Sequence, residues 1–225
     1  MTTPSPELRA RVAELVRQHG SPTQAQVHRR SLAVISLGAA WWIAGALLLG
    51  ADLESRPSGW LLMMLGVWTT TGVLGTYVAL SSGGSSLGRP RPLLMGLSWA
   101  IVSLLLAVSI LAGVLWPETQ SAPAGPWLSH AGCFVFTFVL AAGPLAGLLL
   151  SQARSDPVRP TATGALLGAV AGAWGGVGMS LHCARTEMVH LVIGHVLPVA
   201  GVAIVGAVLG AAVLALSAPK KARNA

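Results

Sequence analysis

The stretch TGALLGAVAGAWGGVGMSLHCARTEMVHLVIGHVLPVAGVAIVGAVLGAAVLAL, residues 163–216, decides the fold of this chain. Two long apolar runs flank the polar segment MSLHCARTEMVH, residues 179–190, and neither run contains Asp, Glu, Lys or Arg. A helix needs about 20 predominantly apolar residues to cross the hydrocarbon core of a bilayer. The stretch therefore predicts two transmembrane helices joined by a short polar turn.

The same pattern recurs along the whole chain of 225 residues. Only 9% of the residues are charged and 53% are hydrophobic, whereas a typical soluble domain has about 25% charged residues. Six uncharged apolar runs are long enough to span a membrane: about 32–51, 60–80, 93–116, 131–150, 161–181 and 191–216. We therefore expect an all-α membrane protein, in which a six-transmembrane-helix bundle (32–216) lies between a cytoplasmic N-terminal arm with a short amphipathic helix (1–31) and a basic cytoplasmic tail (217–225).

The distribution of charge predicts the orientation of the bundle. With both termini in the cytoplasm, twelve of the fourteen Lys and Arg residues lie on the cytoplasmic side, and only Arg56 and Arg185 lie outside. Such a bias is typical of membrane proteins, whose cytoplasmic loops are enriched in basic residues. Topology and attraction to anionic lipid headgroups thus account for the formal net charge of +7, and we do not expect direct binding of nucleic acid.

The N-terminal arm contains the segment SPELRARVAELVRQHG, residues 5–20, which predicts a helix that begins at Ser5 and stops at Gly20. The apolar residues of this helix share one face: Leu8, Val12, Leu15 and Val16. Three interpretations fit this pattern: a helix that rests on the inner leaflet, a helix that docks into a groove of a soluble partner, or a disordered tail without a role. Periodicity alone does not separate them.

Repeated glycines predict how the last two helices pack. In the fifth and sixth apolar runs they recur every four residues: Gly164, Gly168, Gly172 and Gly176, then Gly206 and Gly210. Small residues at this spacing let two helix backbones approach closely in lipid. We expect the fifth helix to pack tightly, either within the chain or against another copy in a homo-oligomer.

Several chemistries are absent from the sequence. The apolar runs hold no charged side chain of the kind that marks ion paths and proton relays, which argues against a coupled transporter or pump. No HExxH, GxSxG or phosphate-binding loop is present either. We therefore expect no enzyme activity and no cofactor beyond a metal ion at the residues described next.

The chemically distinctive residues gather near helix ends on the predicted outer side: His130, Cys133, His182, Cys183, His190 and His195. Several interpretations stay open. The histidines can be interfacial polar residues and the thiols small packing residues, or the two cysteines can form a disulfide, since disulfides persist outside the cytoplasm. A site for zinc or another thiophilic metal, which could share its residues with a reversible thiol switch, would draw on His130, Cys133, His182, Cys183 and His190. Haem is a poor fit, because these histidines do not pair across the bilayer.

The segment GALLGAVAGAWGGVGMSLHCARTEMVHLVIGHVLPVAGVAIVGAVLG, residues 164–210, resembles the C-terminal half of the NrsF-like family of six-helix bacterial membrane anti-sigma factors. In that family a Gly/Ala-rich fifth helix ends in a His-Cys pair, which falls on His182 and Cys183 here. The family's other cysteine, at the outer start of the fourth helix, matches Cys133. The resemblance covers the whole topology and is specific in about residues 160–212.

The resemblance implies a function and the residues that perform it. The arm would hold an extracytoplasmic-function sigma factor at the bacterial inner membrane through Leu8, Arg9, Val12, Leu15 and Val16. A redox, metal or other stress signal would release it after detection by Cys133, Cys183 and His182. The chain departs from the family at Gly194 and His195, where an aromatic pair is usual, and it lacks the usual Arg-Trp close. A small-molecule or metal transporter and an assembly subunit of a membrane complex are the alternative functions.

Overall fold

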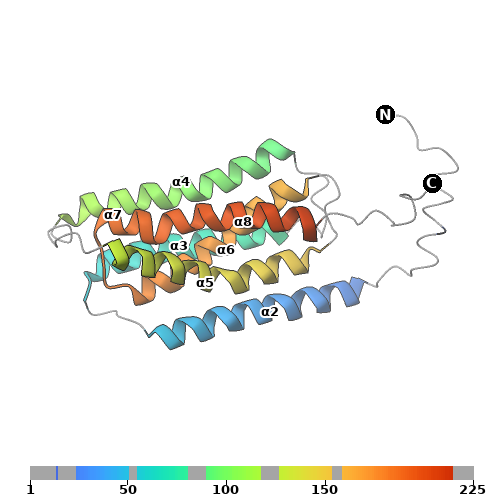
Figure 1. Ribbon diagram of the computed structural model, residues 1–225, viewed down its shortest axis with the longest axis horizontal. Helices are drawn as coiled ribbons and strands as arrows, with labels where there is room; N and C mark the ends of the chain where they lie inside the picture. The colour runs from blue at the N-terminus through green and yellow to red at the C-terminus, as the bar shows by residue number, and fades with distance from the viewer. Residues whose placement is uncertain are drawn as a thin grey trace.

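The computed structural model describes Glu14 and residues 24–50, 55–80, 90–117, 127–153 and 159–214. Within these ranges the regular structure is helical throughout. The helices are α2 (Gln24–Leu49), α3 (Ser58–Leu80), α4 (Arg91–Leu115), α5 (Trp127–Ser151), α6 (Pro160–His182), α7 (Met188–Leu191), the π-helical turn η3 (Val192–Val196) and α8 (Leu197–Val213). Because α7, η3 and α8 follow one another without a break, they form a single long helix that packs beside the other five (Figure 1).

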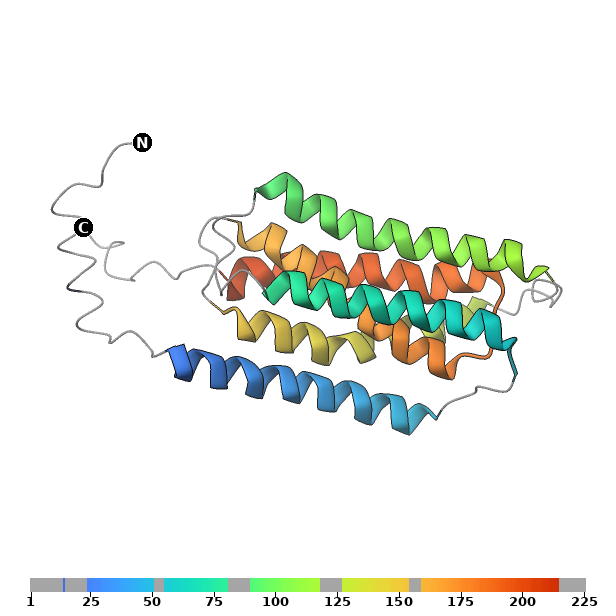
Figure 2. The same cartoon turned by 180° about the vertical axis from the view of Figure 1, so that it is seen from behind.

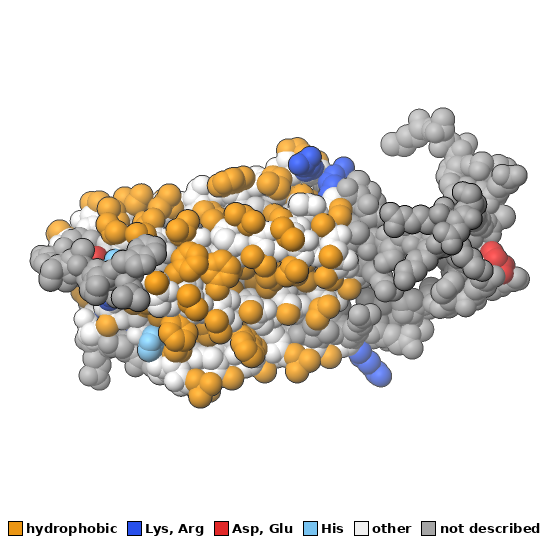
Figure 3. Space-filling view, in the orientation of Figure 1, with side chains coloured by type: hydrophobic (Ala, Val, Ile, Leu, Met, Phe, Trp, Pro, Cys, Tyr) orange, Lys and Arg blue, Asp and Glu red, His pale blue; other side chains and the backbone are white. Residues whose placement is uncertain are grey.

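Length and composition identify these helices as membrane spans. Five stretches are long and apolar enough to cross a bilayer: Ser58–Leu80, Arg91–Leu115, His130–Ser151, Pro160–His182 and Met188–Val213. α2 adds a shorter apolar part, Ile35–Leu49. Hydrophobic side chains cover the long side of the bundle that Figure 3 shows, and charged side chains lie toward its ends. The predicted all-α membrane bundle is confirmed, whereas the predicted amphipathic helix of the arm lies outside the described residues except for Glu14.

α6 is the central helix of the bundle. Its membrane-spanning window is 89% buried inside the chain, whereas the windows of the other four spans are 22% to 44% buried. It contacts each of the other long helices: α2, α3, α4, α5 and α8. α2 runs along one edge of the bundle and α4 along the other in both Figure 1 and Figure 2. The bundle is thus arranged around a helix of small residues, which its neighbours can approach closely.

Glycines of α6 set its distance from α8. A Cβ atom at Gly164 would lie 2.2 Å from the carbonyl oxygen of Gly206, and one at Gly168 would lie 2.3 Å from that of Val202. Because real Cβ atoms essentially never approach other atoms within 3.0 Å, a larger residue fits at neither position unless the backbone moves. Three glycines of the repeat, Gly164, Gly168 and Gly172, therefore pack against the last helix of the same chain, and Gly176 packs against Trp68 of α3. This is the internal alternative of the two that the sequence left open.

α2 is attached mainly to α5, again through glycine. A Cβ atom at Gly38 would lie 2.6 Å from the carbonyl oxygen of Gly143, and Trp41 packs directly on Gly143. The indole N–H of Trp41 donates to a carbonyl group of α5 at 2.9 Å, and that of Trp42 donates to the carbonyl of Trp174 on α6 at 2.7 Å. These bonds satisfy the polar atoms of two tryptophans placed in an apolar span, and they fix α2 against the rest of the bundle.

Candidate functional site

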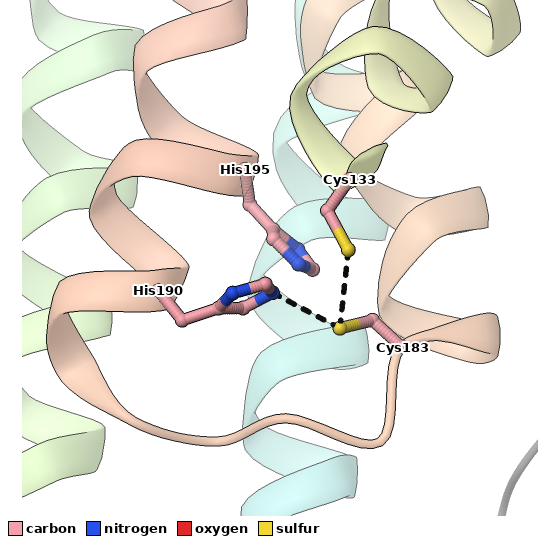
Figure 4. Close-up of side chains that lie close together, drawn as sticks. All are labelled: Cys133, Cys183, His190 and His195. Carbon is pink, nitrogen blue, oxygen red and sulfur yellow. Dashed lines mark hydrogen bonds between the residues drawn. The ribbon is translucent and has the colours of Figure 1, made fainter. Parts of the chain in front are cut away.

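Two cysteines and two histidines meet at the end of the bundle where α5 begins and α6 ends, and we call this group the Cys/His cluster: Cys133, Cys183, His190 and His195 (Figure 4). Cys133 lies in the first turns of α5, Cys183 directly follows α6, and the histidines belong to α7 and η3. One ligand atom from each residue lies within 4.8 Å of the others. Cys133 is half-buried and the other three side chains are buried, so the cluster is largely shielded from its surroundings.

The two sulfur atoms meet without being bonded. The Sγ atom of Cys133 lies 3.6 Å from that of Cys183, and both cysteines are free. A disulfide bond has a length of about 2.05 Å. The pair is therefore a dithiol in hydrogen-bond contact, with Cys133 as the donor.

A chain of hydrogen bonds joins this dithiol to two imidazoles. The Nε2 atom of His190 lies 3.2 Å from Sγ of Cys183, and its Nδ1 atom lies 2.9 Å from Nδ1 of His130. A neutral imidazole donates from one ring nitrogen and accepts at the other. If Cys183 is a thiolate, it accepts from His190, and His130 donates to His190. If Cys183 is protonated, both of these bonds run in the opposite direction.

The surroundings favour the thiolate form of Cys183. The hydrogen bond from the Cys133 thiol is the strongest influence on this group and lowers the pKa of Cys183 below its ordinary value. Burial opposes this effect, while the hydrogen bond with His190 and the electrostatic influence of the nearby His195 ring reinforce it. The thiolate is the nucleophilic and metal-binding form of cysteine, so a lowered pKa favours both kinds of chemistry at Cys183.

A π-helical turn brings the two histidines of the cluster to the same side of their helix. In an α-helix, residues five apart point about 140° away from each other, because each residue turns the chain by about 100°. The turn η3 includes His195 and follows His190. Its i→i+5 hydrogen bonding widens the turn, so residues five apart come close to alignment. The two rings meet edge to face with their centroids 5.5 Å apart.

Thr137 and Gly194 hold this π turn against α5. The Thr137 hydroxyl lies 2.8 Å from the carbonyl oxygen of Cys133 and 3.1 Å from that of Gly194, so it links the two segments. A Cβ atom at Gly194 would lie 3.1 Å from Cβ of Cys133 and 3.4 Å from Nε2 of His190. An aromatic side chain in place of Gly194 would displace these neighbours, so the glycine is part of how the cluster fits together.

Arg56 and an ion pair stabilise the segment that carries Cys183. The buried Arg56 side chain donates to two carbonyl groups in the last turn of α6, and its guanidinium lies 5.6 Å from the ring centroid of Trp60. A cation at this position satisfies carbonyls at the helix end and interacts favourably with the helix dipole. Beyond it, Arg185 and Glu187 form an ion pair at 3.2 Å. Sequence reasoning missed Arg56, although it is one of only two basic residues on the predicted outer side.

The structure brings together most of the predicted outer residues. Both cysteines and His190 belong to the cluster, and its fourth member is His195, which the predicted metal set omitted. His130 contacts the cluster through His190, whereas the half-buried His182 is not among the four. Two sulfurs and two imidazoles make a donor set that could hold a metal ion. The predicted sigma-binding residues lie outside the described part of the chain: Leu8, Arg9, Val12, Leu15 and Val16.

Comparison with known proteins identifies a family that covers nearly the whole chain. The model of the NrsF family, described as negative regulator of sigma F, matches residues 15–215. The matched region contains every described helix from α2 to α8 together with the Cys/His cluster. No curated protein and no solved structure matches the chain.

Proposed function

The chain belongs to the NrsF family of negative regulators of sigma F, and from this premise we propose that it is an anti-sigma factor of the bacterial inner membrane. Its cytoplasmic arm sequesters an extracytoplasmic-function sigma factor. Its Cys/His cluster, on the opposite side of the membrane, detects a redox, metal or other stress signal. The signal releases the sigma factor, which is then free to act in transcription.

The arm is the part of the chain that we assign to the sigma factor. An amphipathic helix can dock its apolar face into a groove of a partner, and the arm offers such a face with an arginine beside it. The binding residues are Leu8, Arg9, Val12, Leu15 and Val16. The excess of Lys and Arg on the arm's side of the bundle supports a cytoplasmic location, where sigma factors are found.

The 3.6 Å approach of two free sulfurs within a largely buried group is the observation that carries the sensing part. A dithiol at this separation can be changed by oxidation or by a thiophilic metal ion. Cys133 belongs to α5, and Cys183 belongs to the junction between α6 and α7. A new bond at the sulfurs would therefore move α5 relative to the centre of the bundle.

α5 offers a packed route from the cluster to the arm. Cys133 lies near its first turn, and the helix then packs along α2 through the contact of Gly143 with Gly38. α2 begins at the end of the bundle away from the cluster (Figure 1). It directly follows the arm in sequence, so a displacement at Cys133 would reach the arm through one helix–helix contact.

Capture of a sigma factor by the full-length chain tests the first part of the proposal. The chain is reconstituted in nanodiscs under reducing conditions and is mixed in turn with each sigma factor of the same organism. We expect one of them to be retained. Val12→Asp places a charge in the apolar stripe and should abolish retention, whereas Glu14→Gln on the opposite face of the helix is the matched control. Retention of none of the sigma factors would refute the proposal.

Release of the captured sigma factor tests the sensing part separately. Treatment with the thiol oxidant diamide or with Cd²⁺ should release it from the unchanged chain. Cys183→Ser should retain the sigma factor and fail to release it under either treatment. If Cys183→Ser releases it as readily as the unchanged chain does, the cluster is not the sensor, although the arm can still be the binding site.

A further inference from the structure

The Cys/His cluster has the donor set of a four-coordinate metal site. We propose that Cys133, Cys183, His190 and His195 together bind one thiophilic divalent cation, of the chemical class of Zn²⁺ and Cd²⁺. The inference deepens the proposed function, because it names the ligand of the sensing site, and it rests on that function only for its regulatory meaning. Thiolate and imidazole ligands select such ions over Mg²⁺ and Ca²⁺, which prefer oxygen donors.

The spacing of the donor atoms is close to that of a tetrahedral site. Bonds of about 2.3 Å to sulfur and about 2.0 Å to nitrogen place two sulfurs roughly 3.8 Å apart, and a sulfur and a nitrogen roughly 3.6 Å apart. The two Sγ atoms are separated by 3.6 Å, and Sγ of Cys183 is 3.2 Å from Nε2 of His190. All four donors lie within 4.8 Å of one another. Closing the widest separation, at most 4.8 Å, to the tetrahedral values requires side-chain shifts of about 1 Å.

His195 supplies independent evidence that the site is built for a ligand. Its side chain is 1% exposed, and neither of its ring nitrogens has a hydrogen-bond partner among the described residues. A buried polar group without a partner is unfavourable and uncommon in folded proteins. The ring faces the sulfurs of Cys133 and Cys183 (Figure 4). A metal bond to one ring nitrogen would satisfy this imidazole, which the hydrogen bonds of the cluster leave out.

His130 holds His190 in the orientation that a ligand requires. Histidines that bind a metal through one ring nitrogen usually donate a hydrogen bond from the other, which fixes the tautomer and the ring orientation. His190 points Nε2 toward Cys183 and places Nδ1 2.9 Å from Nδ1 of the buried His130. With the proton of His190 on Nδ1, this bond leaves Nε2 free to bind the ion. His130 is thus a positioning residue and not a ligand.

Charge balance also fits a divalent ion in a buried place. Cysteine binds a metal ion as the thiolate and histidine binds it as the neutral imidazole. Two thiolates then neutralise the two positive charges of the ion. A neutral centre avoids the large penalty of burying a net charge near the membrane.

Cobalt spectroscopy of the full-length chain tests the proposal without a sigma factor. The chain is purified in detergent under a phosphine reductant, with an affinity tag that contains no histidine, and is titrated with Co²⁺. We expect one equivalent to bind, with the intense visible bands of four-coordinate Co²⁺ and thiolate-to-cobalt charge-transfer bands. Zn²⁺ and Cd²⁺ should displace the Co²⁺, whereas Mg²⁺ should not.

Variants at histidines separate coordination from general damage to the fold. His195→Ala should weaken Co²⁺ binding by more than about 100-fold, the upper end of what loss of a second-shell partner costs. His195→Cys keeps four ligands and should retain tight binding with stronger charge-transfer bands. His182→Ala removes a neighbouring histidine outside the cluster and should leave both affinity and spectrum unchanged.

Two results would overturn the metal site. One is Co²⁺ binding by the unchanged chain that is no tighter than binding by a chain with both cysteines replaced by serine. The other is a His195→Ala variant with full affinity and an unchanged spectrum. Neither result bears on the arm, because sigma-factor capture is measured on the same preparations without metal. Conversely, a chain that captures no sigma factor but binds Co²⁺ as expected would refute the proposed function and leave the site intact.

Discussion

The α6–α8 contact and the Cys/His cluster both involve α6 and the long helix that follows it, and the cluster adds Cys133 of α5, but the two are built by opposite means. In the contact, which we call the glycine seam (Gly164, Gly168, Gly206 and Gly210), backbone meets backbone, and a Cβ atom at Gly206 would lie 2.3 Å from the carbonyl oxygen of Gly164. In the cluster, side chains meet through sulfur and ring nitrogen at 3.2 Å and 3.6 Å. Close contact between two backbones allows a single packing geometry. Thiol and imidazole groups, in contrast, can adopt several protonation states and can bind different ligands. The chain can therefore change its chemistry at one end while the other end stays fixed.

The largest expected effect comes from breaking the seam. Gly168→Leu places a side chain where even a Cβ atom would lie 2.3 Å from the carbonyl oxygen of Val202. Because backbone cannot yield as a flexible side chain does, we expect destabilisation by more than about 3 kcal/mol, the upper end of ordinary overpacking. Thermal unfolding in detergent, followed by size-exclusion chromatography of the heated sample, measures the loss.

The matched control for this substitution is a glycine in an open position. A Cβ atom at Gly66 of α3 meets nothing within 4 Å. Gly66→Ala should therefore be neutral or stabilising by up to about 1 kcal/mol, the difference in helix propensity between the two residues. If Gly168→Leu melts at the temperature of Gly66→Ala, the seam is not as tight as the backbone distances indicate.

A smaller loss is expected at the α6 end that adjoins the cluster. Arg56→Met keeps the bulk of the side chain but removes the donors to two carbonyl groups in the last turn of α6. Hydrogen bonds from a charged group contribute about 2 kcal/mol, so the melting temperature should fall clearly. Arg29→Met, at an exposed position on α2, is the control and should melt like the unchanged chain. Equal melting temperatures for the two variants would show that Arg56 does not stabilise the end of α6.

Thr137→Val loosens the cluster without touching a donor atom. It removes a hydroxyl that contacts the carbonyl groups of Cys133 and Gly194, at an expected cost of about 1 kcal/mol. The more informative result is an increased rate of thiol labelling under reducing conditions, because the π turn is no longer tied to α5. Thr71→Val is the control, since the Thr71 hydroxyl bonds to the carbonyl of Val67 within its own helix. Identical labelling rates in both variants would contradict the link.

The smallest expected effect concerns the loop between α6 and α7. Burial acts to raise the pKa of Glu187, but the hydrogen bond and the charge of Arg185 outweigh it and hold the pKa below its ordinary value of 4.5. A lowered folded-state pKa stabilises the protein above pH 4.5, and this contribution disappears as the pH falls through the lowered pKa. For a partly exposed pair it amounts to less than about 1 kcal/mol.

Stability as a function of pH measures this contribution. Arg185→Gln should narrow the difference in melting temperature between neutral and acidic solution, and added salt should have the same effect on the unchanged chain. A pH profile that Arg185→Gln leaves unaltered would show that the ion pair does not stabilise the loop. The seam, which contains no titratable group among its four glycines, should be insensitive to both changes.

The sequence predicted the bundle well because the membrane imposes a simple rule. Uncharged runs of about 20 residues indicate transmembrane helices, and the glycine repeat indicates a close contact between two helices. The sequence did not reveal which helix the glycine repeat contacts. Glycines at a four-residue spacing look the same whether α8 or a second copy lies opposite, and only the three-dimensional arrangement places Gly164 against Gly206.

The sequence predicted at which end of the bundle the cluster lies, but not which residues belong to it. Topology alone brings Cys133 and Cys183 to the same end of the bundle, whereas the meeting of their sulfurs depends on how α5 and α6 are rotated. His182, which adjoins Cys183 in sequence, was included in the predicted metal set, whereas the structure places His195 in the cluster. Regular α-helical periodicity puts His195 well away from His190, and no simple sequence pattern announces a π turn.

That π turn has a consequence for how such a chain can evolve. A π turn carries one residue more than the α-helical turn it replaces, and each residue rotates everything that follows by about 100°. Deleting one residue from Val192–Val196 would turn either the glycines of α8 away from α6 or His190 away from the cysteines. The glycine seam and the Cys/His cluster therefore both depend on the helix rotation that the π turn sets. A point substitution can change one ligand and keep this alignment, whereas a deletion within the π turn would disrupt the alignment of all that follows.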